Sequence, residues 1–283
     1  MASILRTLPR HEPRGRPGDV GLFGPDSLAW RVNGEIVLLL GAGRALLMQL
    51  AHPAVAAAVA EHSGFPVDAL GRLTRTMDTT FAITFGDSEQ SRLAAARVNA
   101  VHERVHGEVY DALDPQLLLW VHATLVDSAL MVHDRFVGSL SPADRAGYYR
   151  EMKRHATVLR VPPSVLPRTL GAFDRYVRAE IARLEVTDEA RRLATDILSP
   201  PVPLPLRPAA MTFGLITASL LPDSLREGYG LSRRRLVDAG LSMVAAASRI
   251  LLPLVPPVFR TWPGATAARR RVSFPGQGPT LSE

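Results

Sequence analysis

Apolar residues recur every three or four positions along most of the chain from Glu35 onward, which is the spacing of one helix face. No segment alternates apolar and polar residues over the length of a strand. Proline-rich stretches at 162–167, 200–207 and 253–257 mark bends between helices. The pattern predicts an all-α protein with helices at 35–61, 68–85, 88–107, 114–138, 141–157, 169–184, 187–198, 208–220 and 231–252.

The two ends of the chain differ in composition from the rest. Residues 1–22 and 260–283 are rich in Arg, Pro and Gly, and we expect both to be flexible basic tails. The segment 23–259 then forms a single helical domain. Its helix starts are marked by capping residues: Asp26 or Ser27 caps a short first helix, and Asp114 with Pro115 begins the helix at 114–138.

The net charge of +6 does not indicate a nucleic-acid partner, because most of the excess lies in the tails. Residues 1–20 hold four Arg and two acids, and residues 260–283 hold four Arg and one acid. Basic tails of this kind allow peripheral contact with a membrane surface. Residues 1–20 show no apolar segment of a secretion signal, and we expect a cytoplasmic protein.

Two apolar stretches are predicted to be core helices. Ile36–Ala60 is interrupted by Arg44 and His52, and a charge at the centre of a bilayer is costly, so a buried helix is favoured over a membrane span. The helix at 114–138 has no charged residue between Leu117 and Val126, which indicates burial on all sides. Its polar members need hydrogen-bond partners; they are His122, Asp127 and Ser128.

The most informative local motif is His102-Glu103-Arg104-Val105-His106, which matches the H-E-x-x-H pattern of zinc proteases. The apolar stripe of this helix places His102 at the buried margin and Glu103 near the opposite face, away from a metal cleft; the stripe is Ala94, Val98, Val101 and Val105. The chain has no cysteine, so thiolate ligands are excluded. Three interpretations stay open: a zinc hydrolase using His102, Glu103 and His106, a hydrogen-bonded core histidine, and His102 as axial ligand of a haem iron.

The helix at 68–85 carries two stripes on nearly opposite sides. One is an apolar core stripe; its members are Leu70, Leu73, Met77 and Phe81. The other contains Arg72 and Thr76, which are one turn apart and project together. Such a pair can anchor a haem propionate or hydrogen-bond a bound oxygen species. The alternative is a solvated Arg beside a Thr that bonds to its own backbone.

In their order along the chain, several segments resemble the rubber oxygenases (latex-clearing proteins) and the mpaB-type oxygenases. The resemblance covers residues 23–167 well and the rest more loosely. The segments are Phe23–Ser27, Trp30–Glu35, Leu38–Leu47, Gln49–Pro53, Ala60–Ser63, Arg72–Thr76, Phe85–Asp87, Val101–Gly107, Asp114–Pro115 and Trp120–Ala123. The ordered set is specific to the family, whereas no single piece is.

The resemblance implies a globin-like, all-helical domain that holds one haem b. It assigns the axial iron ligand to His102, while His106 occupies a position where the family has a basic residue. It also matches Arg72 and Thr76 to an Arg and a Thr that line the haem pocket, where they would hold a propionate or polarise bound O₂. The expected activity is that of an oxygenase acting with O₂ on an apolar small molecule.

The chain departs from the rubber-cleaving branch at two points. Arg75 stands where that branch has a lysine able to cap the iron, and a guanidinium stays protonated and does not ligate. The acid proposed as catalytic base has no clear match, and Glu61 is the nearest carboxylate. Polyisoprene is therefore not the expected substrate. Further pocket candidates are His52, His62 and His122, and a non-catalytic helical haem- or lipid-binding module is the alternative function.

Overall fold

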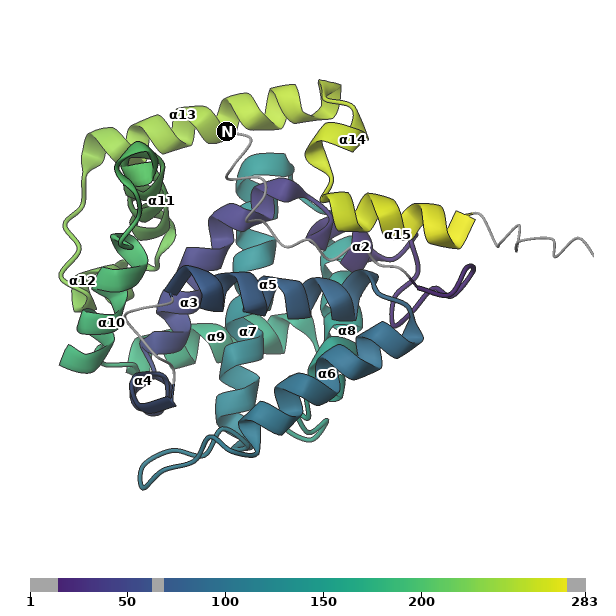
Figure 1. Ribbon diagram of the computed structural model, residues 1–283. Coiled ribbons are helices and arrows are strands. Elements are labelled where there is room, and N and C mark those ends of the chain that lie inside the picture. The colour runs from purple at the N-terminus through teal and green to yellow at the C-terminus, as the bar shows by residue number, and fades with distance from the viewer. Residues whose placement is uncertain (1–14, 63–68, 274–283) are drawn as a thin grey trace, which may run out of the picture.

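The computed structural model describes residues 15–62 and 69–273, and the side chains of residues 69–76 lie outside that description. Within these ranges the chain is helical without any strand, as Figure 1 shows, so the all-α prediction is confirmed. Two isolated β-bridges join Glu35 to Thr261 and His106 to Asp111.

The helices follow one another with short connections. The N-terminal half contains α2 (Leu28–Asn33), the 3₁₀-helix η1 (Ile36–Gly41), α3 (Ala42–Leu50), α4 (Pro53–His62), α5 (Ala69–Phe85), α6 (Ser88–His102), α7 (Pro115–Val132) and the π-helical turn η2 (His133–Val137). The C-terminal half contains α8 (Pro142–Val158), α9 (Leu170–Arg183), α10 (Asp188–Leu198), η3 (Leu204–Leu206), α11 (Arg207–Leu220), α12 (Asp223–Gly228), α13 (Arg235–Leu251), η4 (Leu252–Leu254), α14 (Pro257–Arg260) and α15 (Pro263–Ser273).

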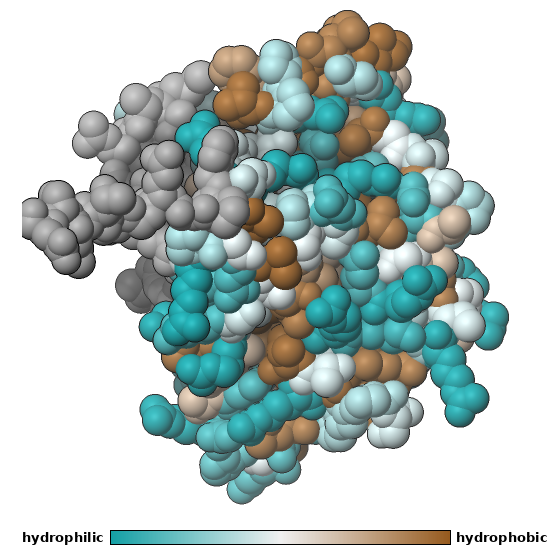
Figure 2. Space-filling view, turned by 90° about the vertical axis from the view of Figure 1, so that its right-hand side faces the viewer, coloured by the Kyte–Doolittle hydropathy of each residue, from teal (hydrophilic) through white to brown (hydrophobic). Residues whose placement is uncertain are grey.

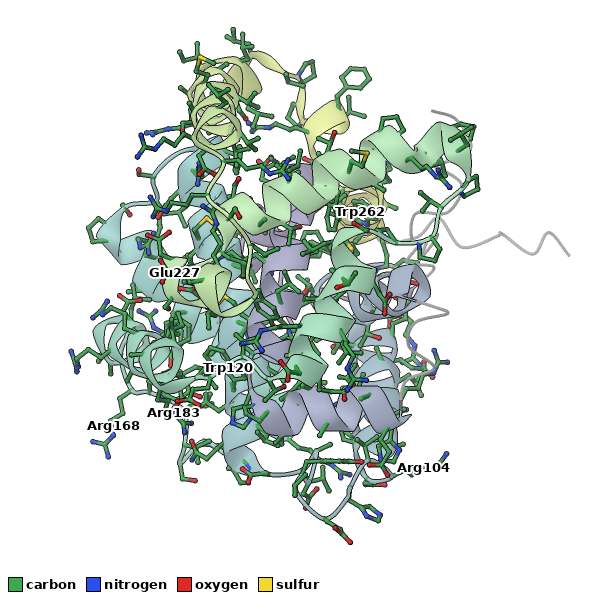
Figure 3. The ribbon with its side chains drawn as sticks, turned by 90° about the vertical axis from the view of Figure 1, so that its left-hand side faces the viewer. Arg104, Trp120, Arg168, Arg183, Glu227 and Trp262 are labelled. Atoms are coloured by element: carbon green, nitrogen blue, oxygen red, sulfur yellow. The ribbon has the colours of Figure 1, made fainter. Side chains whose placement is uncertain are left out.

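Helix α7 is the centre of the fold. It begins as predicted, with the Asp114 side chain accepting from Gln116 N and Pro115 in the first turn. Its residues are buried along most of its length, and α3, η1, α8 and α9 pack around it. Figure 3 shows Trp120 of this helix in the interior, where its Nε1 donates to Met48 O at 3.1 Å. The uncharged stretch that the sequence shows is thus the helix that other helices surround.

The predicted helix at 35–61 is wrong in detail, because the structure divides it into η1, α3 and α4. The chain bends by 102° between Ile36–Leu50 and Pro53–His62. The bend lies at Ala51 and His52, directly before Pro53, whose ring has no N–H to continue the helix of α3. Apolar periodicity continues across this corner, which explains why it looks like one helix in the sequence.

Both expected tails are partly ordered. In the N-terminal one, Arg16 N donates to Asp87 Oδ2 at 2.7 Å and Gly18 N donates to Arg271 O at 3.0 Å. In the C-terminal one, residues 263–273 form α15, which packs on α5, and Trp262 stacks on Phe81 with 4.7 Å between ring centroids. The boundary at 260 is therefore wrong, because the small residues of α15 form an apolar stripe that the core covers. Residues 1–14 and 274–283 lie outside the described ranges.

Two helical stretches in the described part of the chain have the length and apolar composition to cross a membrane. They are Pro115–Val137, which contains α7, and Arg235–Leu254, which contains α13. The bent pair of Ile36–Leu50 and Pro53–His62 passes the same test as a broken span. The first stretch lies inside the protein, whereas α13 runs along the outside of the bundle in Figure 1.

Candidate active site

Helices α5 and α6 form a hairpin whose closed end is tightly packed. Gly86 joins them, and a Cβ at this position would collide with the carbonyl oxygen of Ala82. Asp87 then caps α6, accepting from Gln90 N at 2.7 Å while the Gln90 side chain accepts from Asp87 N. Beside the turn, residues of both helices are buried together; they are Ala82, Ile83, Ala94 and Ala95. Figure 1 shows the helices diverging from this end, and His102 stands at the far end of α6.

His102 is half-buried and its Nδ1 atom is shielded from solvent. The buried stripe of α6 is not the predicted one: it consists of Ser91, Ala94, Ala95 and Asn99. By helical spacing His102 continues this stripe, whereas Val101 is 57 % exposed. The structure therefore places His102 more centrally on the buried face than the sequence pattern suggests. The reason is that α6 ends at His102 rather than at residue 107, so Val105 does not contribute to its surface.

Glu103 and His106, the other two members of the zinc-like motif, both lie at the surface and make contacts unrelated to a metal site. Glu103 Oε1 accepts from Arg160 Nη1 at 2.6 Å in an exposed ion pair, and His106 is exposed beside its bridge partner Asp111. Arg104 points outward in Figure 3. Across residues 15–62 and 69–273 no three His, Asp or Glu side chains lie close enough to hold a metal ion. The geometry gives no support to the zinc-hydrolase alternative.

Replacement of Glu103 by glutamine tests whether Glu103 has a catalytic role in a zinc site or only forms a surface ion pair. Because the pair with Arg160 is exposed, we expect the free energy of unfolding to fall by less than about 1 kcal/mol. Any haem content should be unchanged. Urea denaturation and the absorbance ratio measure the two quantities. Zinc-dependent hydrolysis that Glu103→Gln abolishes would contradict the expectation, because the glutamate of H-E-x-x-H is the general base of a zinc protease.

Arg72, Arg75 and Thr76 belong to the first half of α5, and their side chains lie outside the described residues. Their predicted contacts with a haem and with O₂ therefore stay predictions. The second half of α5 is described, and three of its residues line a cavity; they are Met77, Thr80 and Phe81.

This cavity has a volume of about 130 Å³ and lies between η1, α3, α5, α7 and α8, with Trp262 at one side. Most of its wall is apolar, and it includes Leu38, Leu39, Leu46, Met77 and Phe81. Polar groups are few; they are Asn33, Glu35, Gln49, Thr80, Ser128, Tyr148 and His155. An apolar cavity with a few converging polar groups is the usual form of a small-molecule site.

Glu35 is a carboxylate of this cavity that sequence reasoning missed. Its Oε1 lies 3.8 Å from Arg260 Nε, and its Oε2 is buried without a hydrogen-bond partner. Burial raises the pKa of this carboxyl above its ordinary value. Glu35 ends the family-like segment Trp30–Glu35, but nothing local marks it as a site residue, because its partners Arg260 and Thr261 come more than 200 residues later in the chain.

A pair of histidines lies at the centre of the fold, on α7 and α8. The rings of His122 and His155 are fully buried and stacked, with 5.8 Å between centroids and 25° between planes. None of their four ring nitrogens has a hydrogen-bond partner. Burial lowers the pKa of His122 to about 3, with the neighbouring His155 adding to the effect, and lowers the pKa of His155 to about 4. Both imidazoles are therefore neutral near pH 7.

Sequence reasoning identified His122 as needing a partner and missed His155. A signal for His155 exists on α8, where buried residues follow helical spacing; they are Tyr148, Tyr149, Met152, His155 and Ala156.

The remaining candidates lie apart from this cavity. His52, whose pKa burial lowers, lines an open groove of about 1160 Å³ between α4 and the segment after α9. Glu61 lines the same groove and accepts from Tyr110 Oη at 2.6 Å. His62 is exposed and meets the edge of the Tyr110 ring. None of the three residues lines the cavity that His155 lines.

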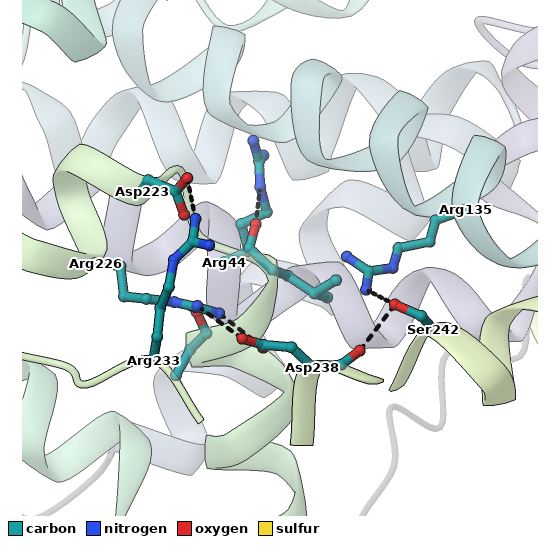
Figure 4. Close-up of polar contacts among 9 residues, drawn as sticks. Arg44, Arg135, Asp223, Arg226, Arg233, Asp238 and Ser242 are labelled. Atoms are coloured by element: carbon teal, nitrogen blue, oxygen red, sulfur yellow. Dashed lines mark hydrogen bonds and ion pairs between the residues drawn. The ribbon is translucent and has the colours of Figure 1, made fainter. Parts of the chain in front are cut away.

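Arg44 is the hydrogen-bond partner of Asp127 and Ser128, which the sequence predicts to need one. Its guanidinium donates to Asp127 Oδ2 at 2.6 Å, to Ser128 Oγ at 2.7 Å and to the Leu220 carbonyl at 2.9 Å, and Figure 4 shows the last contact. The buried arginine thus ties α3 to α7 and α11. This network is structural, and it holds the wall of the cavity to which Ser128 belongs.

Comparison with known proteins places the chain in a family. The family model described as "ER-bound oxygenase mpaB/B'/Rubber oxygenase, catalytic domain" matches residues 30–250. Two similar proteins are the uncharacterized proteins Mb2261 of Mycobacterium bovis and Rv2237 of Mycobacterium tuberculosis, each 29 % identical over 224 residues that cover 73 % of this chain and 87 % of the relative. No solved structure matches the chain. The chain belongs to the family of mpaB-type and rubber oxygenase catalytic domains.

Proposed function

We propose that the protein is a haem b-dependent oxygenase that acts on an apolar small molecule, with His102 as the axial ligand of the iron. The family match supports an oxygenase catalytic domain. The observation that carries the finer proposal is the place of His102: a half-buried imidazole at the end of a helix, in line with the buried stripe of α6, with its Nδ1 shielded from solvent. A single imidazole of this kind is the usual protein ligand of a haem b.

The donor chemistry of His102 fits such a group. A haem needs one strong protein ligand, and His102 supplies it without the cluster of acidic or histidine ligands that a bare metal ion requires. Arg72 and Thr76 would hold a propionate or bound oxygen from α5, and Arg75 would leave the distal side of the iron without a protein ligand. The activation of O₂ is the chemistry that the haem supplies when it is bound.

The chain itself supplies binding and exclusion of water. The cavity of about 130 Å³ is close in size to a cavity that holds benzene, so it suits the substrate rather than the haem. Phe81 and Trp262 stack at one side of it and Leu39 lies in its wall, which keeps the bound molecule dry. Water exclusion strengthens every polar contact inside the site.

The non-catalytic haem- or lipid-binding module stays as the alternative, because a pocket by itself does not show turnover. Cytoplasmic localisation remains a prediction, and so does peripheral membrane contact through the basic ends of the chain. The family description names an ER-bound member, which concerns that protein.

The absorbance spectrum of protein from haem-supplied cells tests the proposal. We expect a Soret band that shifts on addition of dithionite and carbon monoxide, because Arg75 does not ligate and would leave the iron accessible. Oxygen uptake with a panel of apolar compounds then separates an oxygenase from a carrier. Folded, haem-supplied protein without a Soret band would remove His102 as an iron ligand.

A further inference from the structure

His122 and His155 differ from the other buried polar groups of the core. Trp120, Tyr229 and Arg44 each donate to a backbone carbonyl within 3.1 Å. Single buried atoms elsewhere, such as Trp30 Nε1 and Thr84 Oγ1, also lack a partner, but in the two stacked histidines both nitrogens of each ring lack one. A buried polar group without a hydrogen bond costs free energy, and a pair of them calls for a partner from outside the chain.

The pair is open to such a partner on one side. His155 lines the cavity, whereas His122 does not and stacks behind it. Each ring is neutral and therefore offers one N–H donor and one acceptor nitrogen. The mostly apolar wall disfavours an ion, which would lose its hydration there, and the Glu35 carboxyl in the same wall disfavours an anion in particular. A neutral hydroxyl or carbonyl group meets both conditions.

We propose that the cavity binds an apolar molecule of about the size of benzene that carries one hydroxyl or carbonyl group, and that His155 hydrogen-bonds to this group. His122 holds the His155 ring in place by stacking. The claim that this ligand is the substrate rests on the proposed oxygenase function. The claim that the cavity binds such a molecule does not. A sequestered water on His155 is the alternative occupant.

Binding of 4-methylphenol and of toluene to the purified protein, with whatever cofactor it carries, tests the proposal by calorimetry. The two probes differ by one hydroxyl, and one net hydrogen bond corresponds to about tenfold tighter binding of 4-methylphenol. In His155→Phe the ratio should fall to about one, since the ring is kept and the nitrogens are lost. His155→Gln should restore part of the ratio, and His106→Ala, an exposed imidazole, should leave it unchanged.

Ring ¹⁵N chemical shifts of His155 give a second readout that a purely structural role would not move. They should change with 4-methylphenol and much less with toluene. Equal affinities, no binding of either probe, or unmoved His155 signals would overturn the proposal and favour water. Intact binding without oxygen uptake would leave this site standing and count against the oxygenase function.

A different observation carries a second inference, on the outer side of α13 and α14. We call this the α13–α14 face; its exposed apolar residues are Leu236, Met243, Val244, Ile250, Leu251, Leu254, Val258 and Phe259. Leu236 is 89 % exposed and Phe259 is 73 % exposed. Figure 2 shows apolar residues gathered along the top of the molecule, where these helices lie in Figure 1. Exposed apolar residues gathered on one face mark an interaction site.

The charges around the face are mainly basic. Residues 232–260 contain five Arg and a single acid, Asp238. Arg233 pairs with Asp223 and Arg260 lies 3.8 Å from Glu35, which leaves three arginines beside the face, at 234, 235 and 249. Asp238 is paired with Arg226 at 3.2 Å, as Figure 4 shows. The partner should therefore combine an apolar interior with a negative surface. A second copy of the chain would bring arginines against arginines, which is repulsive.

We infer that the α13–α14 face lies on an anionic lipid bilayer, with α13 parallel to the membrane plane. The inner side of α13 is already occupied, because Leu241 and Ala245 are buried against η2 and its neighbours. An amphipathic helix with this division of apolar and basic groups binds at the interface of a bilayer rather than across it. The inference concerns ordered helices and not the terminal residues.

Co-sedimentation with vesicles tests it. We expect binding to phosphatidylcholine vesicles that contain phosphatidylglycerol and at least about tenfold weaker binding to phosphatidylcholine alone. Met243→Glu with Ile250→Glu should abolish binding, whereas Val109→Glu, an exposed apolar residue in the loop after α6, should not. Absent or charge-independent binding would overturn the inference. So would a dimer in solution that the double substitution dissociates, because a second copy would then cover the face.

Discussion

Replacement of His102 by alanine is expected to abolish haem retention. The imidazole is the one candidate ligand that both the family resemblance and the position on the buried stripe of α6 support. Loss of the proposed proximal ligand would leave a bound haem without its protein ligand to the iron. The ratio of Soret absorbance to protein absorbance in the purified variant should fall to near the background level.

His106→Ala is the matched control, because it removes an imidazole four residues away that is exposed to solvent. Its haem content should equal that of the unsubstituted protein. Circular dichroism of both variants verifies that each is folded. Equal haem contents in the two variants would refute the assignment, and loss in both would favour joint ligation by the motif. If His155→Phe instead lost the haem, the cavity would be the haem site.

Replacement of Arg44 by methionine is expected to give the largest loss of stability among single polar substitutions. The guanidinium side chain is 6 % exposed and makes three hydrogen bonds that join α3, α7 and α11. Its removal leaves Asp127 and the Leu220 carbonyl without their partner. Breaking a buried pair on one side costs about 3–5 kcal/mol, and the lower end applies because Asp127 is partly exposed.

Urea denaturation measures this loss, and an exposed pair in the same protein provides the control. Arg31 donates to Asp144 at 2.7 Å near the surface, so Arg31→Met should lower the free energy of unfolding by less than about 1 kcal/mol. The double variant Arg44→Met with Asp127→Leu should recover part of the loss, because no charge is then left unpaired. Equal losses for the two single variants would show that the Arg44 network contributes little.

The sequence predicts the helices well where their boundaries carry local chemistry. Ser27 accepts from Trp30 N and Asp114 from Gln116 N, as capping residues do. Boundaries set by packing were missed. The corner before Pro53 and the end of α6 at His102 interrupt patterns that continue in apolar periodicity. Helix α15 was missed because its composition is that of a tail, although the core covers one side of it.

The candidate site also has a part that the sequence predicts and a part that depends on distant segments. The ordered motifs around His102 mark the family without any coordinates, because they are local in the sequence. The cavity and its polar groups are not local: Glu35 meets Arg260, and His122 stacks on His155 across two helices. A histidine on an apolar helix has several possible environments, and only the neighbouring helix decides among them.

By itself the sequence determined the all-α class, the buried central helix and the family, since each follows from periodicity, capping or an ordered set of motifs. Only the tertiary structure decided that Arg44 pairs with Asp127, that His122 stacks on a neutral His155 which lines a cavity, and that α13 keeps an apolar side outward. Periodicity tells which residues share a face of one helix. What that face meets is set by segments far apart in the chain, 83 residues for Arg44 and Asp127.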